Sequence, residues 1–447
     1  MKPPPVLGLI GAAVLLAAAA GCGGDDGTQE TAGVPVANAG ADQEVAVGTP
    51  VSLDGSRSRS PSGAALNYVW ALSVVPSGSA ASLSAAESVN PTFTPDVEGV
   101  YEIELEVDDG ANAGKPDTVA VTASRFAEVL PYAAVDAEYS TLLDRIVLVS
   151  ANPNQLHIHD PATGKESAVA LPQVPACVSV HPAAPFAAVC HDANVSYVNL
   201  STATVERILP VSVNVYDAVL AANGWIYAVP TEGGWDAFRC IKVDTGEETV
   251  GADNDLLENT VIRLHPNGRW IYGANKSHPN DLDKFSIEGG TATALYDSQY
   301  HGDYDMCENA WIYETGARII TACGNVFSST ELQETDMVYA GKIENSTSVV
   351  AAVHSSTAGA IVTVPGGERI WDDIENEDTV MNVYDPDFLT FRKQIALPRM
   401  KEGDSKSVSH GRFVFFDSTG TKLFVVVNGD ADAPLAARSG VAVIDGL

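Results

Sequence analysis

Three histidines and the carboxylates beside them are the residues of this sequence best suited to bind a metal ion. The histidines are His301, His354 and His410. Imidazole nitrogens combined with carboxylate oxygens are typical ligands of zinc and other transition metals, whereas carboxylates alone are typical of calcium. Their spacing matches no local metal motif, so a site requires a fold that brings them together. The charged residues next to them in sequence are Asp303, Asp305 and Arg412.

A second set of candidate ligands lies in acidic segments such as "DDIENED" and "NGDADAP". A ring of carboxylates around a low-dielectric opening raises the local concentration of cations. These segments could therefore hold calcium or a cationic partner. The alternative is that they are only solvated and keep the protein soluble. The candidates are Asp372, Asp373, Asp430 and Asp432.

The overall charge excludes two classes of partner. The 447 residues contain 25 Lys and Arg against 58 Asp and Glu, which gives a formal net charge of −33. Nucleic acids and anionic membrane surfaces are bound through basic patches, so neither is an expected partner. The sequence also lacks the G-x-S-x-G, H-E-x-x-H and P-loop motifs of common enzyme classes.

The element that must position the candidate ligands is a repeated pair of strands joined by a tight turn. The phrase "HPNGRWIYGAN" at 265–275 is similar to "AANGWIYAVP", "YETGARIITACG", "VPGGERIWDD" and "DSTGTKLFVVVNGD". The full repeat contains four strands in about 40–50 residues, which is the size of a β-propeller blade. One such sheet cannot bury both faces alone, whereas blades stacked around an axis cover one another.

Residues 125–447 are therefore predicted to form seven blades. The seventh blade ends after its third strand, and residues 126–131 are expected to supply the fourth, which leaves no open edge. The long acidic loops then share one face, and the first strands line the central channel, where the three histidines could converge. First strands are predicted to start near Tyr132, Cys177, Asp217, Val261, Cys307, Gly359 and His410.

These repeats resemble the YVTN-type β-propeller family, in which a Pro-x-Gly turn precedes an alternating strand. A His-Gly pair often opens a blade in that family, and His410-Gly411 matches it. Related propellers host lyases and lactonase-like hydrolases at the channel mouth. By this analogy of fold alone, an enzyme is the alternative to a binding protein.

Residues 34–124 show short alternating runs separated by turn residues, which is the pattern of a β-sandwich. Trp70 is expected on a central strand, and Tyr101 is expected to form a tyrosine corner. The phrases "VANAGADQEVAVG", "VSLDGSRS", "YVWAL" and "NPTFTPDVEGVYEIELEV" resemble the PKD domain, an immunoglobulin-like family. The resemblance implies a spacer or adhesion module. The predicted fold class of the chain is all-β, an immunoglobulin-like β-sandwich followed by a seven-bladed β-propeller.

The N-terminus is typical of an export signal. Its apolar run, 6–20, is shorter than the roughly 20 residues of a membrane span. The run ends in "AAGC", which resembles the lipobox of bacterial lipoproteins, and Cys22 would become the acylated N-terminus that holds the protein on the cell envelope. The predicted signal peptide is 1–21 and the flexible tether is 22–33. The alternative is an ordinary cleaved signal with an incidental cysteine.

The other five cysteines fit an exported, oxidised protein. Cys177 and Cys190 flank "HPAAPF", and Cys307 and Cys323 flank "YETGAR". Each pair is expected to face across a hairpin and to form a disulfide. Cys240 is expected to remain a buried thiol on the third strand of blade three. The alternative is five reduced cysteines in the core.

The predicted function is that of a non-enzymatic cell-envelope lipoprotein, on the outer membrane or cell surface. Its propeller would be a binding scaffold that contacts a protein or glycan through the acidic loop face. The alternative is a lactonase-like or lyase enzyme with a metal at the channel mouth. Calcium or a transition metal is the only candidate cofactor, the lipid anchor is the only expected membrane contact, and the protein is expected to be a monomer. His157 and His159, in "HIHD", are assigned to the surface because no third ligand is evident.

Overall fold

The chain divides into two compact units after Ser124. The predicted signal peptide, Cys22 and three acidic candidates (Asp372, Asp373 and Asp432) lie outside the described residues. No helix in the described ranges is long and apolar enough to cross a membrane. The computed structural model describes residues 33–277, 280–346, 348–366, 379–430, 435 and 438–444.

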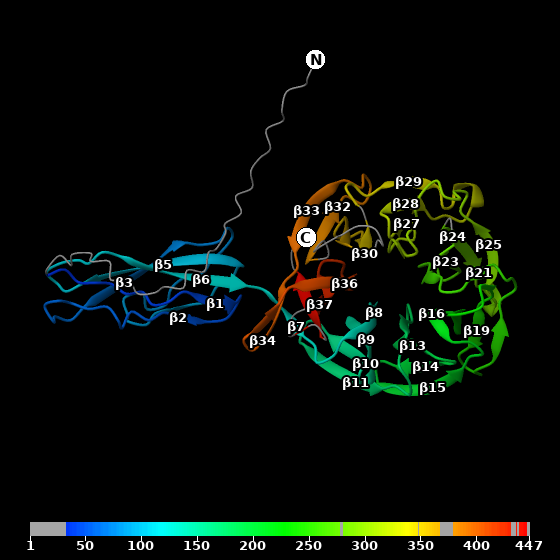
Figure 1. The fold of residues 1–447 in the computed structure, drawn as a ribbon, viewed down its shortest axis with the longest axis horizontal. Helices are drawn as coiled ribbons and strands as arrows, with labels where there is room; N and C mark the ends of the chain where they lie inside the picture. The colour runs from blue at the N-terminus through cyan, green and yellow to red at the C-terminus, as the bar shows by residue number, and fades with distance from the viewer. Residues whose placement is uncertain are drawn as a thin grey trace, which may run out of the picture. The chain divides into compact units, whose positions relative to one another are not determined.

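The first unit is a sandwich of two sheets (Figure 1). One sheet has the strand order β1-β6-β5-β3, and the other pairs β2 with β4. Alternate residues of β5 are buried and the residues between them are exposed, as expected for a sheet with one solvated face. The strands are β1 (Gln43–Ala46), β2 (Val51–Ser52), β3 (Asn67–Val74), β4 (Thr92–Phe93), β5 (Gly99–Asp108) and β6 (Asp117–Ser124).

Two aromatic residues organise the core of the sandwich. Trp70 is 3 % exposed, and its indole N–H donates to the carbonyl of Ser88 at 3.1 Å. The Tyr101 side chain is fully buried, and its hydroxyl donates to the carbonyl of Val97 at 2.9 Å. This bond reaches back to a residue four positions upstream, so the predicted tyrosine corner is confirmed.

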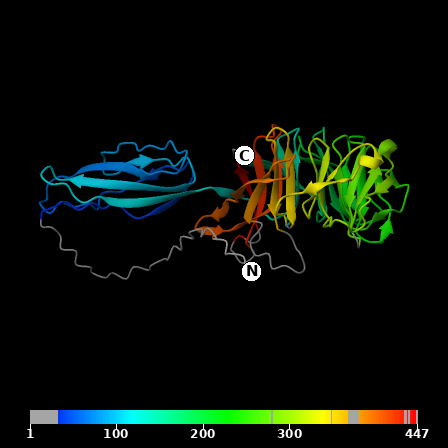
Figure 2. The same ribbon diagram turned by 90° about the horizontal axis from the view of Figure 1, so that it is seen from above.

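The second unit is a ring of seven sheets around a central channel (Figure 1), and Figure 2 shows the ring edge-on. The first four blades follow one another along the chain, each with its first strand nearest the axis. These strands are β8 (Ala134–Ser140), β9 (Arg145–Ala151), β10 (Asn154–Asp160), β11 (Lys165–Ala170); β12 (Cys177–Val180), β13 (Phe186–His191), β14 (Asn194–Asn199), β15 (Thr204–Pro210); β16 (Val215–Leu220), β17 (Trp225–Pro230), β19 (Arg239–Lys242), β20 (Glu248–Val250); and β22 (Val261–Leu264), β23 (Trp270–Ala274), β24 (Leu282–Ser286), β25 (Thr293–Asp297).

Blades 5 to 7 complete the ring, and three small elements decorate it. The blade strands are β26 (Ala310–Ile312), β27 (Arg318–Thr321), β28 (Asn325–Ser328), β29 (Tyr339–Lys342); β30 (Val349–Ser355), β31 (Ala360–Pro365), β32 (Val380–Tyr384), β33 (Phe391–Ala396); and β36 (Ser409–Phe416), β37 (Leu423–Gly429), β38 (Ser439–Ile444). The decorations are the ribbon β18 (Trp235–Asp236) with β21 (Leu256–Leu257), and the 3₁₀ turns η1 (Glu288–Gly290) and η2 (Gln333–Thr335).

The ring closes through an N-terminal strand. β7 (Phe126–Val129) pairs antiparallel with β38, so it is the fourth strand of blade 7. The hairpin of β34 (Arg399–Glu402) and β35 (Ser405–Ser407) then pairs with the outer edge of β7. This hairpin was not predicted, and it covers the edge that the closing strand would otherwise present to solvent.

The predicted start of blade 6 near Gly359 is wrong. Its first strand, β30, begins at Val349, and Gly359 lies in the turn between β30 and β31 with a positive φ of 56°. The phrase "VPGGERIWDD" suggested a first hairpin, but Val364 and Pro365 end the second strand instead. The error moved every expected position in this blade to the other end of its strand.

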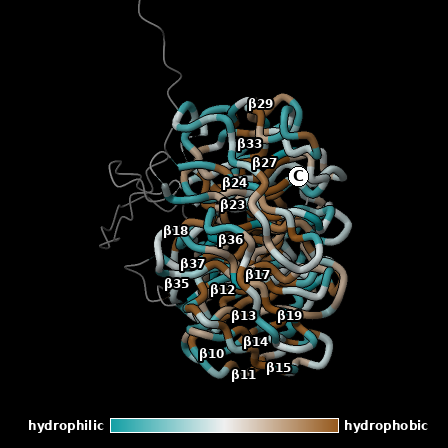
Figure 3. Tube along the Cα trace, turned by 90° about the vertical axis from the view of Figure 1, so that its right-hand side faces the viewer, coloured by the Kyte–Doolittle hydropathy of each residue, from teal (hydrophilic) through white to brown (hydrophobic). Residues whose placement is uncertain are grey.

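Alternating side chains of each inner strand fill two different interfaces. In β9, Val147 and Val149 belong to the apolar cluster shared with blade 2, whereas Ile146 and Leu148 belong to the cluster shared with blade 7. Each pair of neighbouring blades shares such a cluster, and Figure 3 shows hydrophobic strands inside hydrophilic loops. Strands covered on both faces therefore have continuous apolar runs.

A buried ion pair joins blades 4 and 5. The Lys284 ammonium donates to Oδ2 of Asp336 at 2.7 Å, and the two side chains are 1 % and 0 % exposed. The ammonium lies 3.8 Å from the ring centroid of Trp270, and the hydroxyls of Tyr272 and Tyr296 donate to the same carboxylate. Such a pair is tolerated in a core only because its remaining hydrogen-bonding groups are satisfied.

Both predicted disulfides are present. Cys177 and Cys190 are direct cross-strand partners with Cα atoms 5.0 Å apart, and Cys307 and Cys323 have Cα atoms 5.3 Å apart. Cys240 is a buried thiol on β19, the third strand of blade 3, and its sulfur accepts the N–H of Ala292. Disulfides are typical of proteins that fold in an oxidising compartment.

Candidate functional site

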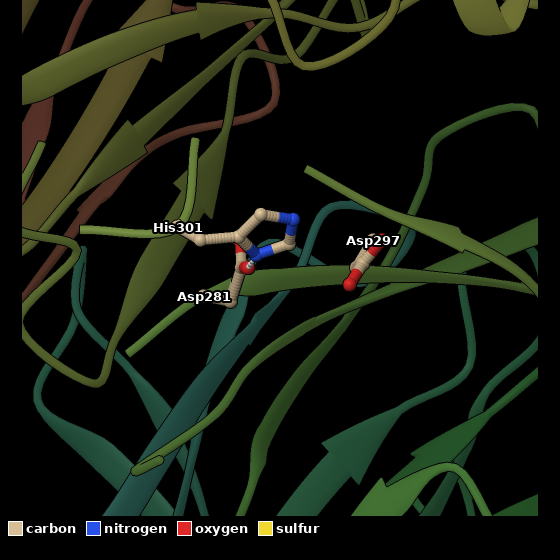
Figure 4. Close-up of side chains that lie close together, drawn as sticks. All are labelled: Asp281, Asp297 and His301. Carbon is tan, nitrogen blue, oxygen red and sulfur yellow. Dashed lines mark hydrogen bonds and ion pairs between the residues drawn. The ribbon is translucent and has the colours of Figure 1, made fainter. Parts of the chain in front are cut away.

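One group of metal-ligand side chains is found on blade 4. Asp281 precedes β24, Asp297 ends β25, and His301 follows in the connection to β26. One ligand atom of each lies within 4.8 Å of the others, and no second group of this kind occurs in the described ranges. Figure 4 shows the three side chains together. The group lies on the face that carries the long loops, because β24 begins and β25 ends on that face.

Asp281 is the buried member of this group. Its Oδ2 accepts a hydrogen bond from Nδ1 of His301 at 2.9 Å, and its Oδ1 accepts the N–H of Leu282 at 2.8 Å. Burial raises the pKa of Asp281, although hydrogen bonds from Ser298 and Leu282 oppose this effect. The side chain of His301 is 61 % exposed, so a metal can approach the imidazole from solvent.

The group concentrates negative charge without a compensating cation. Burial raises the pKa of the adjoining Asp283 to about 7, against a hydrogen bond from Asn275, and the charges of Asp281, Asp297 and Asp255 raise it further. Within the described part of the chain, no Lys or Arg forms an ion pair with Asp281, Asp283 or Asp297. A bound cation would remove this mutual repulsion and favour the ionised carboxylates.

Of the predicted ligands, His301 alone belongs to the group. Asp303 and Asp305 are exposed in the loop that follows it, outside the group. His410 lies on β36 opposite Asn428 of β37. Asp430 follows β37, where its backbone N–H donates to a serine hydroxyl at 2.9 Å. Asp281 and Asp297 were missed, although each stands directly at a strand end beside an acidic loop.

His354 lies at the opposite end of its strand from the inter-blade loops. It is the penultimate residue of β30, next to the tight turn, because that strand begins earlier than the sequence suggested. Its ring stacks on Tyr313 with centroids 4.2 Å apart, and burial lowers its pKa. The structure therefore does not bring His354 together with His301.

Sequence analysis also missed the charged residues of the central channel. A cavity of about 320 Å³ is lined by residues of every blade. They include Asp136 and Glu138 of β8, Asp217 of β16 and Arg263 of β22, together with the predicted ligand Arg412 of β36. The available signal was a charged residue inside an apolar first strand, as in "VYDAVL" and "VIRL".

The channel carboxylates also connect neighbouring blades. Asp136 accepts the backbone N–H of Val178 at 2.8 Å, and Glu138 accepts that of Val180 at 2.6 Å. Asp217 makes the equivalent bond from blade 3 to blade 4 at 2.9 Å. Burial raises the pKa of Asp136 to about 6 and that of Glu138 to about 8, although these hydrogen bonds oppose it.

The assignment of His157 and His159 to the surface is wrong. They are 2 % and 0 % exposed, because the face of β10 that carries them lies under Tyr132 and the closing strand β7. His157 hydrogen-bonds Glu166 at 2.9 Å. His159 lies between Glu166 and Glu128, 3.5 and 3.6 Å from their carboxylate oxygens. These contacts tie blade 1 to the strand that closes the ring.

Replacing Glu166 with glutamine is expected to loosen this junction in a pH-dependent way. Burial opposes ionisation of Glu166, but hydrogen bonds from His157, His159 and Tyr132 lower its pKa to about 2. Its contribution to stability is thus complete above the unfolded pKa near 4.5 and is lost as the pH falls towards 2. Urea unfolding should show a loss of about 2 kcal/mol at pH 7 that shrinks below pH 4. The exposed control Glu206→Gln should show neither effect, and a loss independent of pH would contradict this role.

Comparison with known proteins identifies both units at the level of fold. Residues 39–123 match a family model described as a PKD domain. The chain is similar to the β-propeller domain of Cps50 (Swd1) from Myceliophteria thermophila, with a TM-score of 0.52 and 10 % identity over 71 % of this chain and 98 % of that chain. Hydrazine synthase of Kuenenia stuttgartiensis matches with a TM-score of 0.45 and 14 % identity, over 70 % of this chain and 95 % of that chain.

No curated protein matches the sequence. The identities to solved structures are low, so these likenesses concern the fold alone. PKD-type domains and disulfides are features typical of extracellular or exported proteins. The chain thus combines a PKD-like β-sandwich with a disulfide-bonded β-propeller, an architecture that suggests an interaction scaffold.

Proposed function

We propose that this protein is a non-enzymatic, exported lipoprotein whose propeller binds a partner through a metal ion on its acidic loop face. The observation that carries the proposal is the group of Asp281, Asp297 and His301, in which one imidazole and two carboxylates meet without a Lys or Arg partner in the described ranges. Nitrogen and oxygen ligands of this kind favour zinc or another divalent transition metal over calcium. The metal would be held by three protein ligands and would leave a position open to an acidic or polar group of the partner.

Metal titration tests this proposal. Isothermal titration of the full chain with zinc is expected to show one tight site, whereas calcium should bind more weakly. Asp281→Asn and His301→Ala should each weaken zinc binding by at least about tenfold, since each removes one of three ligands. Asp303→Asn is the matched control, because Asp303 is acidic, exposed and outside the group. Equal zinc affinity for Asp281→Asn and Asp303→Asn would contradict the site.

Lipid anchoring is the second part of the proposal, and it rests on the sequence "AAGC". Expressed in a bacterium with its leader, the protein is expected in the membrane fraction and in the detergent phase of a phase separation. Cys22→Ser should move it to the aqueous phase, because acyl chains supply the membrane affinity. An unchanged membrane fraction in Cys22→Ser would contradict lipidation and would leave the metal site unaffected.

A further inference from the structure

The central channel contains two groups of opposite charge that do not bind each other. Glu138 of β8 uses Oε2 to accept the N–H of Val180, and within the described residues its Oε1 has no hydrogen-bond partner. The guanidinium of Arg412, on β36 of the neighbouring blade, makes no hydrogen bond or ion pair with the described residues. Both side chains line the same cavity.

The other charged groups of the channel are already engaged. Arg263 donates to the side-chain oxygen of Asn309 at 3.0 Å and lies 3.6 Å from Asp217. Asp217 accepts two backbone N–H groups, and Asp136 does the same. The free capacity for new polar contacts is therefore concentrated on Glu138 and Arg412.

The walls between these two groups are aromatic. The rings of Tyr139, Trp311, Phe413 and Phe415 line the cavity, whose volume of about 320 Å³ suits a small organic molecule rather than a macromolecule. Aromatic faces attract an ammonium group and bury an apolar body, while a guanidinium forms paired hydrogen bonds with a carboxylate.

We infer that the channel binds a small zwitterion that carries both an ammonium and a carboxylate group, an aminocarboxylate. Its carboxylate binds Arg412, its ammonium binds Glu138, and its carbon skeleton lies against Trp311 and the neighbouring rings. This ligand is chosen over a metal ion because the channel carboxylates do not form a close ligand group in the described part of the chain. It is chosen over a simple amine or a simple acid because either would leave one of the two channel groups without a partner.

Ligand binding is expected to release a proton. Burial holds the pKa of Glu138 at about 8, so this carboxyl group is mostly protonated in the free protein at neutral pH. An ammonium beside it favours the ionised form and lowers that pKa. Affinity should therefore rise with pH between about 6 and 8.

Calorimetric titration of the full chain with a panel of aminocarboxylates tests the inference. The panel runs from glycine to 6-aminohexanoate and includes the aromatic L-amino acids, each with its amine-only and acid-only analogue, in EDTA so that the blade 4 site plays no part. At least one aminocarboxylate should bind, with both analogues at least tenfold weaker. Arg412→Gln and Glu138→Gln should each weaken binding at least tenfold, and only Glu138→Gln should abolish proton release, measured in buffers of different ionisation enthalpy.

The controls are charge changes outside the channel. Arg269→Gln and Asp281→Asn should leave aminocarboxylate binding unchanged, since Arg269 is exposed and pairs with Glu288 outside the cavity. Three results would overturn the inference: no binding by any panel member at millimolar concentration, equal binding of an amine-only analogue, or binding that survives both channel substitutions. None of these results depends on the metal site of blade 4.

Discussion

Replacing Lys284 with methionine is expected to lower the free energy of unfolding of the propeller by about 3–5 kcal/mol. Methionine fills a similar volume but leaves the Asp336 carboxylate, which is 0 % exposed, without its ammonium partner. The hydroxyls of Tyr272 and Tyr296 and the N–H of Thr330 still donate to that carboxylate, but they do not neutralise its charge. The contact of the ammonium with the Trp270 ring is lost as well.

Urea unfolding followed by tryptophan fluorescence measures this loss, because Trp270 reports directly on the site. Lys276→Met is the matched control: Lys276 is 38 % exposed, and its distance to Glu308 is 3.9 Å, so it should cost less than about 1 kcal/mol. The double variant Lys284→Met/Asp336→Leu should recover much of the loss, since no buried charge remains. Equal effects of Lys284→Met and Lys276→Met would contradict the structural role of this pair.

The second large effect is expected from Glu138→Gln, with the opposite sign. The pKa of this carboxyl group is raised to about 8 by burial, from a reference value of 4.5. Below pH 4.5 the proton is bound in both the folded and the unfolded chain, and the folded state loses nothing. As the pH rises from 4.5 to 8 the unfolded chain ionises first, so the stability of the wild-type propeller falls.

Glutamine stays neutral and can still accept the N–H of Val180 through its amide oxygen. Glu138→Gln should therefore equal the wild type near pH 4 and exceed it by about 3 kcal/mol at pH 8 to 9. Thermal unfolding across this pH range measures the difference. The exposed control Glu247→Gln should follow the wild type throughout, and a Glu138→Gln variant that is less stable at about pH 9 would contradict the buried, neutral state of this group.

The fold was predictable because its signals are local and repeated. Turn residues and alternating apolar runs mark each hairpin, and one hairpin repeated along the chain requires a ring in which blades cover each other. The disulfides followed from the same symmetry, since Cys177 and Cys190 are equally far from one turn. Tyr101 was recognisable because its corner is a contact over only four residues.

The site was less predictable because it depends on which strand ends meet in space. His301 was identified, but its partners Asp281 and Asp297 belong to the third and fourth strands of the blade, where sequence carries no sign of proximity. His354 was misplaced because an error in the start of one strand exchanges its two ends. His157 and His159 were expected to be exposed because the cover comes from a strand that belongs to the last blade of the ring.

The central claim is that the loop face of blade 4 holds a metal ion between Asp281, Asp297 and His301. Anomalous diffraction from a crystal of the full chain grown with equimolar zinc, recorded on both sides of the zinc absorption edge, tests it most directly. The account predicts one dominant peak within about 2.3 Å of ligand atoms of all three side chains, and its disappearance in Asp281→Asn. A dominant peak elsewhere on the chain, or no peak at these residues in crystals whose solution zinc binding is saturated, would contradict it.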